Sequence, residues 1–473
     1  MYHQQMNKLR FSLDLQKKQS LVEQIRMNIA DAIRRGHLYE GARLPSWRDL
    51  AVQLGVSRGT VKAAYDRLND DQLIISKGAA GTFVASILPA TPNVTERAAR
   101  LPLPSLYQDL DSAPRPFQVG VPAQDAFPFK LWSRIMLRCS RQAVAEPLRY
   151  PDPRGELALR KEIAAYLAVA RGLVCSADQI VITNGYAGAL GLALHLLPLE
   201  AHQVWIEDPG YPLTRYAISL AGYTPVPISV DSQGMRIEQG ISRAAEARLA
   251  IVTASQQAPL GMQLSLDRRR ALLTWARENA GWIIEDDYLS ELQLSGRATP
   301  ALASLDHDGR VLHIGTFSKT ISPRLRLGFM VLPAALAELA GDTVAALSPA
   351  SALPGQLAVA EFLRDGHYLR HIRRMKRLYA QRRDALLELM EESAAVHNVA
   401  GLSLLVHLPD DVDDVHIADA AQHFGLAPAP LSPWYATDSA ASKGLLLGVT
   451  NLSNQALTEG YRHLAGLLPH HCR

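Results

Sequence analysis

The sequence is poor in cysteine and has no long apolar run. Its three cysteines, Cys139, Cys175 and Cys472, are far apart and show no C-x-x-C spacing, which argues against a disulfide framework or a structural zinc site and favours a reducing cytoplasm. The first thirty residues are polar and charged, without the apolar core of a signal peptide. No stretch approaches the roughly 20 apolar residues that a membrane-spanning helix requires. We therefore expect a cytoplasmic protein with no metal site and no membrane association.

The chain does have enough apolar material for a large core. It contains 473 residues, of which 48% are hydrophobic and 20% charged, a composition typical of a globular protein with more than one structural unit. The net charge of +3 is unevenly distributed: residues 1–86 hold 13 Lys and Arg against 8 Asp and Glu, and the remainder holds 36 against 38. A basic N-terminal part on a slightly acidic body indicates a polyanion-binding module joined to something else.

The N-terminal 86 residues show the pattern of two short helices separated by a glycine turn. The predicted elements are helices over 19–35, 47–54 and 58–68 and strands over 73–76 and 82–85. Ser46 and Ser57 are suitable N-caps for the second and third helices, and Gly55 separates the two. The two strands would form a hairpin after the last helix. The layout predicts a winged helix-turn-helix domain over 1–86.

The helix over 58–68 would place its N-terminal residues in the major groove of DNA. Arg58 and Lys62 lie one helical turn apart, so both can reach the same groove, and the fork of Arg58 suits guanine. Arg48, Ser57 and Lys77 complete the expected DNA-binding set, with Arg48 and Lys77 as phosphate contacts. The alternative is a small interaction domain with solvated cations. The caps, the turn glycine, the cation spacing and the hairpin favour DNA.

Residues 87–116 are rich in proline. Prolines at this density predict a semi-extended spacer that is stiffer than a Gly/Ser linker. The basic module would then sit far from the body or over a partner subunit. A surface-bound arm is the other interpretation of the same residues.

From Phe117 onward, strand-like and helical segments alternate, which predicts a mostly parallel sheet with both faces covered. The predicted strands are 179–183, 203–206, 249–254, 282–284 and 311–314. Each of them runs into a polar loop, and in such sheets the functional site lies at the carboxyl ends of the strands. The body would span 117–473, with about 345–473 as a smaller subdomain.

The stretch 311–328 carries the residues of a candidate cofactor site. Lys319 follows a buried strand, where desolvation would lower the pKa of its amine as a Schiff-base lysine requires. Thr316, Ser318 and Arg326 surround it and suit a phosphate dianion. An amine beside a phosphate site predicts pyridoxal 5'-phosphate, an aldehyde carried on a phosphate. A surface turn with ordinary cations is the alternative for these residues alone.

Other strand ends supply matching partners for this cofactor. Gly185, Tyr186 and Ala187 open a helix whose backbone N–H groups would bind the phosphate. Asp286 can pair with the protonated pyridine nitrogen, which makes the ring an electron sink. Tyr288, two residues on and hence on the same side of an extended segment, could bond the phenolic oxygen. Tyr211 could stack on the ring.

The N-terminal segment resembles the winged helix of GntR-type regulators. The residues that carry the resemblance are Leu44-Pro45-Ser46, Arg48-Asp49-Leu50-Ala51, Leu54-Gly55-Val56-Ser57-Arg58, Val61, Tyr65, Leu68 and Gly81-Thr82-Phe83-Val84. The resemblance implies DNA contacts from Arg48, Arg58, Lys62 and the hairpin. Gly59 departs from the pattern, because a larger or hydroxyl residue is common there.

The body resembles the aminotransferase class I/II fold of fold-type I vitamin B6 enzymes, and the whole chain resembles the MocR/GabR branch of GntR regulators. The carriers are Tyr150-Pro151-Asp152-Pro153-Arg154-Gly155, Glu207-Asp208-Pro209-Gly210-Tyr211, Ile284-Glu285-Asp286-Asp287-Tyr288, Gly315-Thr316-Phe317-Ser318-Lys319-Thr320 and Leu325-Arg326-Leu327-Gly328. The resemblance implies Lys319 as Schiff-base lysine, Asp286 as partner of the pyridine nitrogen, Tyr288 as partner of the phenolic oxygen and Arg326 as phosphate ligand. The implied fold is multi-domain: a winged helix, then a large α/β domain with a smaller C-terminal α+β subdomain.

Departures from the family pattern lie around the site. In the loop 253–261, Gln257 belongs to the expected cofactor-binding set, but Gln256 replaces a histidine and Leu260 a small hydroxyl residue. Arg324 stands where glycine is usual.

The expected substrate-binding arginine is missing near the C-terminus. Active aminotransferases bind the substrate carboxylate through an arginine, and the matching run here, 443–448, has none. Without that bidentate partner, ordinary transamination of amino acids is disfavoured. Lys443 or Arg215 could substitute.

These features together predict a bacterial transcription regulator, associated with the nucleoid when bound to DNA. It would bind operator DNA through the winged helix and sense pyridoxal phosphate, an amine or an amino acid through Schiff-base exchange at Lys319. We expect a homodimer, in which the linkers either cross to the partner subunit or stay with their own, and at most partial aminotransferase chemistry. The alternatives are a working aminotransferase with an accessory DNA module and a structural dimerising domain without cofactor.

Overall fold

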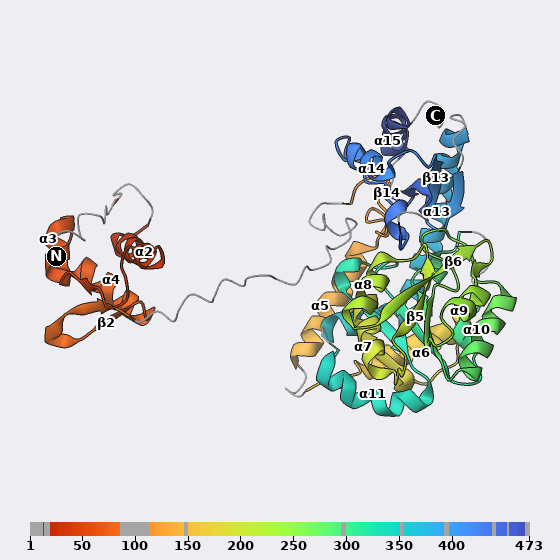
Figure 1. The fold of residues 1–473 in the computed structure, drawn as a ribbon, viewed down its shortest axis with the longest axis horizontal. Coiled ribbons are helices and arrows are strands. Elements are labelled where there is room, and N and C mark those ends of the chain that lie inside the picture. Colours follow the sequence, from red (N-terminus) through yellow and green to blue (C-terminus); the bar gives the residue numbers. More distant parts are fainter. Residues whose placement is uncertain are drawn as a thin grey trace. The chain divides into compact units, whose positions relative to one another are not determined.

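The computed structural model describes residue 13 and residues 19–85, 114–145, 150–294, 299–350, 353–391, 397–437, 441–451 and 454–468. The chain divides into two compact units, residues 1–102 and residues 103–473 (Figure 1). We call them the N-terminal and the C-terminal unit. The expected linker over 87–116 lies almost entirely outside the described residues, so its extended character stays a prediction.

The N-terminal unit is a winged helix. Its elements are α2 (Leu21–Arg34), β1 (Arg43–Leu44), α3 (Trp47–Leu54), α4 (Arg58–Asp70), β2 (Ile74–Ser76) and β3 (Thr82–Val84), with the strands in the order β1-β3-β2. The Ser46 and Ser57 hydroxyls accept hydrogen bonds from the backbone N–H groups of Asp49 and Thr60, which confirms both as N-caps. Gly55 ends α3 with a φ of +64°, a left-handed conformation that glycine adopts without strain.

The C-terminal unit is built around an eight-stranded sheet. Its strands are β4 (Ile180–Thr183), β5 (Gln203–Asp208), β6 (Thr224–Asp231), β7 (Gly234–Met235), β8 (Leu249–Val252), β9 (Trp282–Asp287), β10 (Val311–Thr316) and β11 (Gly328–Val331). Their order is β4-β11-β10-β9-β8-β5-β6-β7. The strands β10, β9, β8, β5 and β6 pair in parallel, whereas β11 and β7 pair antiparallel with their neighbours. The predicted mostly parallel sheet is confirmed; the sequence did not predict β6, β7 or β11.

Helices cover both faces of this sheet (Figure 1). On one face, α7 (Gly185–Leu196), α8 (Pro212–Leu220) and α11 (Ala334–Leu347) pack on alternate strand residues such as Ile284 and Ile314. On the other face, α6 (Leu157–Arg171), α10 (Leu266–Glu278) and α12 (Leu353–Arg364) pack on the residues in between, such as Ile283 and Ile182. Helices α5 (Phe129–Ala145) and α9 (Ile237–Arg243) complete this layer arrangement. The strand interiors are therefore apolar on both sides, as a covered parallel sheet requires.

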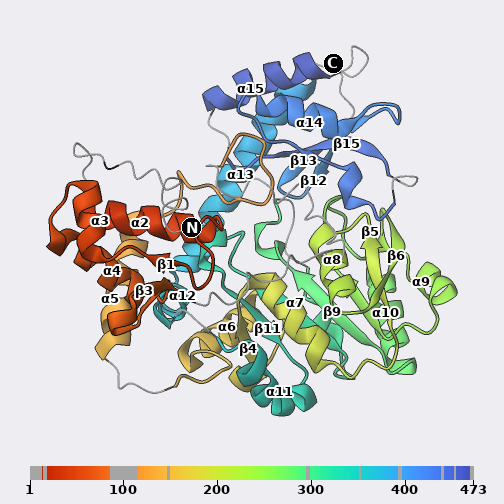
Figure 2. The ribbon, with the colours of Figure 1, turned by 60° about the vertical axis from the view of Figure 1, so that its left-hand side comes forward.

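A second, smaller sheet follows. Its strands are β12 (His397–Ala400), β13 (Ser403–Leu408), β14 (Ala429–Pro430) and β15 (Lys443–Gly448), antiparallel in the order β12-β13-β15-β14, and its helices are α13 (His367–Glu391), α14 (Asp414–Gln422) and α15 (Asn454–Leu467). Figure 2 shows this sheet and its helices together at one end of the unit. Phe117 pairs with Gly448 of β15, so the start of the unit joins the small sheet, a contact that the sequence did not predict. No helix in the described ranges has the length and apolarity to cross a membrane.

Candidate cofactor site and DNA-binding surface

Three strand ends of the large sheet meet at the start of helix α7. The sheet register places Thr316 of β10 opposite Gly328 of β11, and Gly328 opposite Thr183 of β4. A Cβ atom on Gly328 would lie 3.0 Å from the Cα atom of Gly185 and 2.9 Å from the carbonyl oxygen of Gly315. This close approach requires glycine, and it brings the first turn of α7 against the end of β10.

The predicted phosphate ligands gather at this helix start. The Arg326 guanidinium donates a hydrogen bond to the Asn184 carbonyl (3.2 Å), next to Gly185, the first residue of α7. Thr316 Oγ1 lies 3.0 Å from Ser318 Oγ and accepts a hydrogen bond from the Ser318 backbone N–H. A helix N-terminus, two hydroxyls and an exposed arginine are the groups that bind a phosphate dianion. Arg326 adopts a left-handed φ of +48°, a strained conformation for a residue other than glycine and one that is concentrated at functional sites.

The Lys319 amine contacts a segment near the start of the C-terminal unit. Its Nζ atom donates a hydrogen bond of 2.9 Å to the Gly120 carbonyl. Burial lowers the pKa of Lys319, and the charge of Asp286 opposes that shift in part. A lowered pKa makes the neutral, nucleophilic amine more accessible, as a Schiff-base lysine requires.

Asp286 is a buried carboxylate without a matching donor. In the described part of the chain it accepts no hydrogen bond, and only 7% of the residue is exposed. Its pKa is raised well above the usual range, because burial and the neighbouring Asp287 and Glu207 disfavour the charged form, while Lys319 opposes them. A buried carboxylate of this kind fits the protonated ring nitrogen of pyridoxal phosphate, which would supply the missing cation. The residues present therefore fit the cofactor.

This unpaired carboxylate gives a testable prediction. The folded protein keeps Asp286 protonated at pH values at which the unfolded chain has already released this proton. The difference favours the folded state at low pH, and the free energy of unfolding falls as the pH rises through the raised pKa. Asp286→Asn should therefore raise the free energy of unfolding of the cofactor-free protein at neutral pH, by about 1 kcal/mol. It should also weaken pyridoxal phosphate binding at least about tenfold, because an amide cannot neutralise the ring nitrogen.

Urea titrations of the cofactor-free protein and equilibrium dialysis of pyridoxal phosphate measure the two effects. Asp267→Asn, at an exposed aspartate on α10, is the matched control. Lower stability together with unchanged cofactor affinity would contradict the assignment of Asp286.

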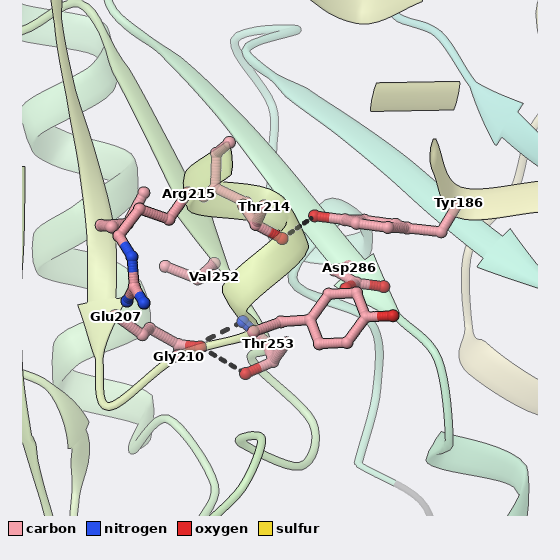
Figure 3. Close-up of a pocket in the computed structure, with 11 residues that line it drawn as sticks. Tyr186, Glu207, Gly210, Thr214, Arg215, Val252, Thr253 and Asp286 are labelled. Atoms are coloured by element: carbon pink, nitrogen blue, oxygen red, sulfur yellow. Dashed lines mark hydrogen bonds between the residues drawn. The ribbon is translucent and has the colours of Figure 1, made fainter. Parts of the chain in front are cut away.

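Aromatic side chains surround Asp286. The Tyr186 hydroxyl bonds Thr214 Oγ1 at 2.7 Å, and the Tyr186 and Tyr211 rings meet edge to face with centroids 6.1 Å apart. The pocket at this point is lined by Tyr186, Ile206, Glu207, Gly210, Tyr211, Thr214, Arg215, Ile251, Val252, Thr253 and Asp286 (Figure 3). Tyr288 is not among the lining residues, but burial and the charge of Asp286 raise the pKa of both Tyr211 and Tyr288. Tyr211 thus lines the same pocket as Asp286, whereas a contact of Tyr288 with the cofactor stays a prediction.

Gln257, which the sequence places in the cofactor-binding set, joins two loops in the structure. Its side-chain amide donates to the carbonyls of Pro209 and Ala258, each at 2.7 Å, and its Oε1 atom accepts from the Leu260 backbone N–H at 3.0 Å. The side chain is fully used in joining two loops and does not line the pocket. Direct contact of Gln257 with the cofactor stays a prediction.

The sequence analysis missed Glu207 as a pocket residue. Its carboxylate accepts hydrogen bonds from the backbone N–H and the hydroxyl of Thr253, and Figure 3 shows both bonds on the side of the pocket away from Asp286. Burial raises the pKa of Glu207 to about 7, although the Thr253 hydrogen bonds act in the opposite direction. The sequence feature that could have identified Glu207 is its position at the end of strand β5, where the other site residues were expected.

The sequence analysis also missed a buried charge network behind Asp286. His313 Nδ1 lies 2.9 Å from Glu285 Oε2, and Arg171 Nε lies 2.8 Å from Asp287 Oδ2. Burial disfavours the charged form of His313, but Glu285 and Asp287 outweigh it, so the pKa of His313 is raised. The sequence did contain a sign of this network: side chains alternate along β9, so Glu285 and Asp287 lie on the face of the sheet opposite Asp286. The network fixes the strand that presents the candidate cofactor ligand.

The predicted DNA-binding residues form an exposed set in the N-terminal unit. Arg48, Ser57, Arg58, Lys62 and Lys77 are all exposed. On α4 the opposite face, which includes Val61 and Leu68, is buried in the core of the unit. Arg58 and Lys62 therefore lie on the solvent side of the helix that a winged helix-turn-helix inserts into the major groove. Gly59 stands between them, and a side chain there would meet only Ser57 Oγ at 3.7 Å.

Two family models match the chain. One describes bacterial regulatory proteins of the gntR family and matches residues 21–84. The other describes aminotransferase class I and II and matches residues 128–422. The two matches correspond to the winged helix and to the large body.

Relatives share this two-part organisation along almost their whole length. The probable rhizopine catabolism regulatory protein MocR of Rhizobium meliloti is 33% identical over 95% of this chain and 93% of its own. The pyridoxine biosynthesis transcriptional regulator PdxR of Corynebacterium glutamicum is 31% identical, over 90% of each chain. The transcriptional regulator TauR of Rhodobacter capsulatus is 30% identical over 95% of this chain and 96% of its own.

Solved aminotransferase structures match about three quarters of the chain. A kynurenine aminotransferase of Pyrococcus horikoshii superposes with a TM-score of 0.66 at 26% identity, covering 74% of this chain and 89% of that one. An archaeal alanine:glyoxylate aminotransferase superposes with a TM-score of 0.69 at 25% identity, covering 76% and 91%. The predicted aminotransferase-like fold is thereby confirmed.

Proposed function

Because this chain belongs to the MocR-type branch of the GntR family, which are DNA-binding transcriptional regulators with an aminotransferase class I/II domain, we propose that its body is the sensor. The ligand sensed would be pyridoxal 5'-phosphate or a small amine or amino acid that reacts with it. The observation that carries the proposal is a lysine with a lowered pKa, Lys319, and a buried carboxylate without a hydrogen-bond donor, Asp286, which feel each other's charge near the helix start and arginine that suit a phosphate. A body that served only to dimerise the protein would have no need to bury these charges.

The roles of the site residues follow from their positions. Arg326, Thr316, Ser318 and the start of α7 (Gly185, Tyr186 and Ala187) would hold the phosphate, Asp286 the ring nitrogen, and Tyr211 and Tyr288 the ring. When bound, pyridoxal phosphate supplies an aldehyde that reacts reversibly with primary amines.

Lys319 would hold that aldehyde carbon until an effector amine replaces it. An incoming primary amine would take the place of the Lys319 amine on the aldehyde, and the hydrogens that its nitrogen gives up would pass to Lys319 Nζ, so that the lysine would be released as a free amine. Lys319 thus acts as an exchangeable ligand rather than as the base of a reaction cycle.

We propose that the regulator acts as a cytoplasmic homodimer. The domain assignment that goes with it is a DNA-binding domain over 1–86, a linker over 87–116 and the sensor over 117–473. Two winged helices in one dimer would recognise two DNA half-sites, whose spacing depends on how the linkers hold them. Effector binding must favour one of these arrangements to change DNA affinity.

The test is a footprint on DNA selected from a genomic-fragment pool, made with and without pyridoxal phosphate and with the amine effectors added. We expect protection of paired half-sites and a change in DNA affinity of at least about threefold when the cofactor site is loaded. Equal affinity with the site loaded and empty would overturn the sensor role. Sustained keto-acid production from an amino acid would instead identify a working aminotransferase.

A further inference from the structure

Lys319 lies in a single tight turn that directly follows strand β10. The backbone N–H of Ile321 donates a hydrogen bond of 2.8 Å to the Phe317 carbonyl, which closes the turn around the lysine. We call residues 317–322 the lysine turn. Phe317 and Thr320, on either side of Lys319, are both buried. The conformation of the lysine turn therefore determines the point from which the Lys319 side chain extends.

Helix α13 holds the residue after the lysine through two hydrogen bonds. His371 Nε2 lies 2.7 Å from the backbone carbonyl of Thr320. The Tyr368 hydroxyl donates to Thr320 Oγ1 at 3.2 Å. Tyr368 and His371 are three residues apart, so they lie on the same face of α13. All three residues are at most 5% exposed, so both bonds are shielded from water.

The bond to Thr320 fixes the tautomer of His371. A carbonyl only accepts hydrogen bonds, so Nε2 carries the proton and Nδ1 has the lone pair. Nδ1 is buried and has no hydrogen-bond partner in the described part of the chain, and the ring packs against Phe127 and Phe362, with centroids 5.3 and 6.3 Å away. Burial lowers the pKa of His371, although the bond to Thr320 opposes the shift. An apolar side chain would fill this space without leaving a buried nitrogen unpaired, so the bond to Thr320 is what the histidine specifically contributes.

The same helix also holds the segment that the lysine amine contacts. Lys319 Nζ donates to the Gly120 carbonyl, and three residues further on the Ala123 backbone N–H donates to the Tyr379 hydroxyl at 2.8 Å. Tyr379 lies about two turns after His371 on α13. Helix α13 is thus bonded both to the lysine turn and to the segment that accepts from the amine.

We propose that His371 and Tyr368 are positioning residues of the candidate cofactor site. By holding Thr320, they place the Lys319 amine where the aldehyde of pyridoxal phosphate would meet it. This inference rests on the proposed function and adds to it two residues that do not line the pocket beside Asp286. A displacement of a reacting atom by about 1 Å can cost on the order of a hundredfold in reactivity. Loss of these bonds should therefore weaken covalent attachment at Lys319 and spare the phosphate and ring contacts.

A double-mutant cycle on the full-length protein tests the proposal. His371→Leu removes the bond to Thr320 and keeps an apolar side chain in the same space. We expect it to lower the affinity for pyridoxal phosphate at least about tenfold in the wild-type background. In the Lys319→Ala background, which has no amine to position, the same substitution should change the affinity less than about twofold. Equilibrium dialysis measures the affinity of all four proteins.

Covalent capture of the cofactor is the second readout. At saturating pyridoxal phosphate, borohydride reduction followed by mass spectrometry gives the fraction of protein with the cofactor joined to Lys319. We expect this fraction to fall at least about threefold in His371→Leu. His371→Gln supplies an amide N–H donor in place of the ring N–H, and its captured fraction should stay within about twofold of the wild type.

Two further variants separate positioning from damage to the helix. Leu386 is buried on α13, about four turns after His371. Leu386→Ala should lower the melting temperature and leave affinity and capture as in the wild type. Tyr368→Phe removes only the hydroxyl that bonds Thr320 and should lower capture at least about twofold, which keeps the proposal testable if His371→Leu does not fold.

Each other result has a definite meaning. An equal loss of affinity with and without Lys319 would show a general structural role and overturn the positioning role. Unchanged affinity and capture in folded His371→Leu protein would overturn it as well, as would a His371→Gln protein that behaves like His371→Leu. Wild-type protein that retains no pyridoxal phosphate would instead overturn the proposed function itself.

Discussion

Replacing Lys319 with alanine should abolish stable retention of pyridoxal phosphate. The substitution removes the amine that would hold the aldehyde, so the cofactor keeps only its phosphate and ring contacts and exchanges freely with solvent. We expect the affinity to fall at least about a hundredfold, since a covalent linkage is replaced by noncovalent contacts alone. Visible absorbance of the purified protein measures the loss, and reduction with borohydride followed by mass spectrometry should label the Lys319 peptide of the wild type only.

The control for this experiment is Lys161→Ala, at an exposed lysine on α6, which should retain cofactor like the wild type. Thermal unfolding of the Lys319 variant checks that it folds. A chromophore that copurifies with folded Lys319→Ala protein would refute the assignment of Lys319.

Arg58→Ala should remove specific DNA binding while leaving the cofactor site intact. Arg58 is exposed at the first position of α4, where a side chain of the recognition helix reaches base edges. Loss of a bidentate contact to guanine costs about 1–3 kcal/mol, which corresponds to roughly 5- to 150-fold in affinity for each half-site. Fluorescence anisotropy on the selected DNA, repeated over a range of salt concentrations, measures the change.

Two comparisons separate readout from misfolding in this variant. Arg34→Ala removes an exposed arginine at the far end of α2 and should reduce affinity much less. Pyridoxal phosphate retention should be the same in Arg58→Ala and wild-type protein, because the two residue sets lie in different units. If DNA affinity and cofactor retention fell together, the variant would be misfolded and the role of Arg58 would have to be tested with Arg58→Lys.

The parts of the site that could be predicted are those that local rules determine. Ser46, Ser57 and Gly55 were identifiable because caps and turn glycines act within a few residues. Lys319 and Asp286 were identifiable because each follows an apolar strand, and parallel strands present their carboxyl ends at one edge. Both inferences use only the order of residues along the chain.

The parts that could not be predicted depend on packing between distant segments. Phe117 reaches β15 across more than 300 residues of chain, and one buried apolar cluster joins segments from Val119 to Leu446. The sequence gives the apolar character of Leu446 but not the face of the sheet on which it lies, because that depends on where helices cover β15. Gln257 has a packing role that the sequence did not predict, because its side chain joins two loops; its contact with the cofactor stays a prediction.

The left-handed backbone of Arg326 has an evolutionary consequence. At a φ of +48° glycine or asparagine would be the more stable choice, so the backbone favours replacement of the arginine in every generation. If Arg326 binds the phosphate as proposed, selection for that ligand opposes this effect of the backbone. In a lineage that gave up the ligand, this position should therefore be among the earliest in the site to change, well before buried neighbours such as Thr316 and Asp286. The residue at this one position would then serve as a record of whether a descendant still binds a phosphorylated ligand.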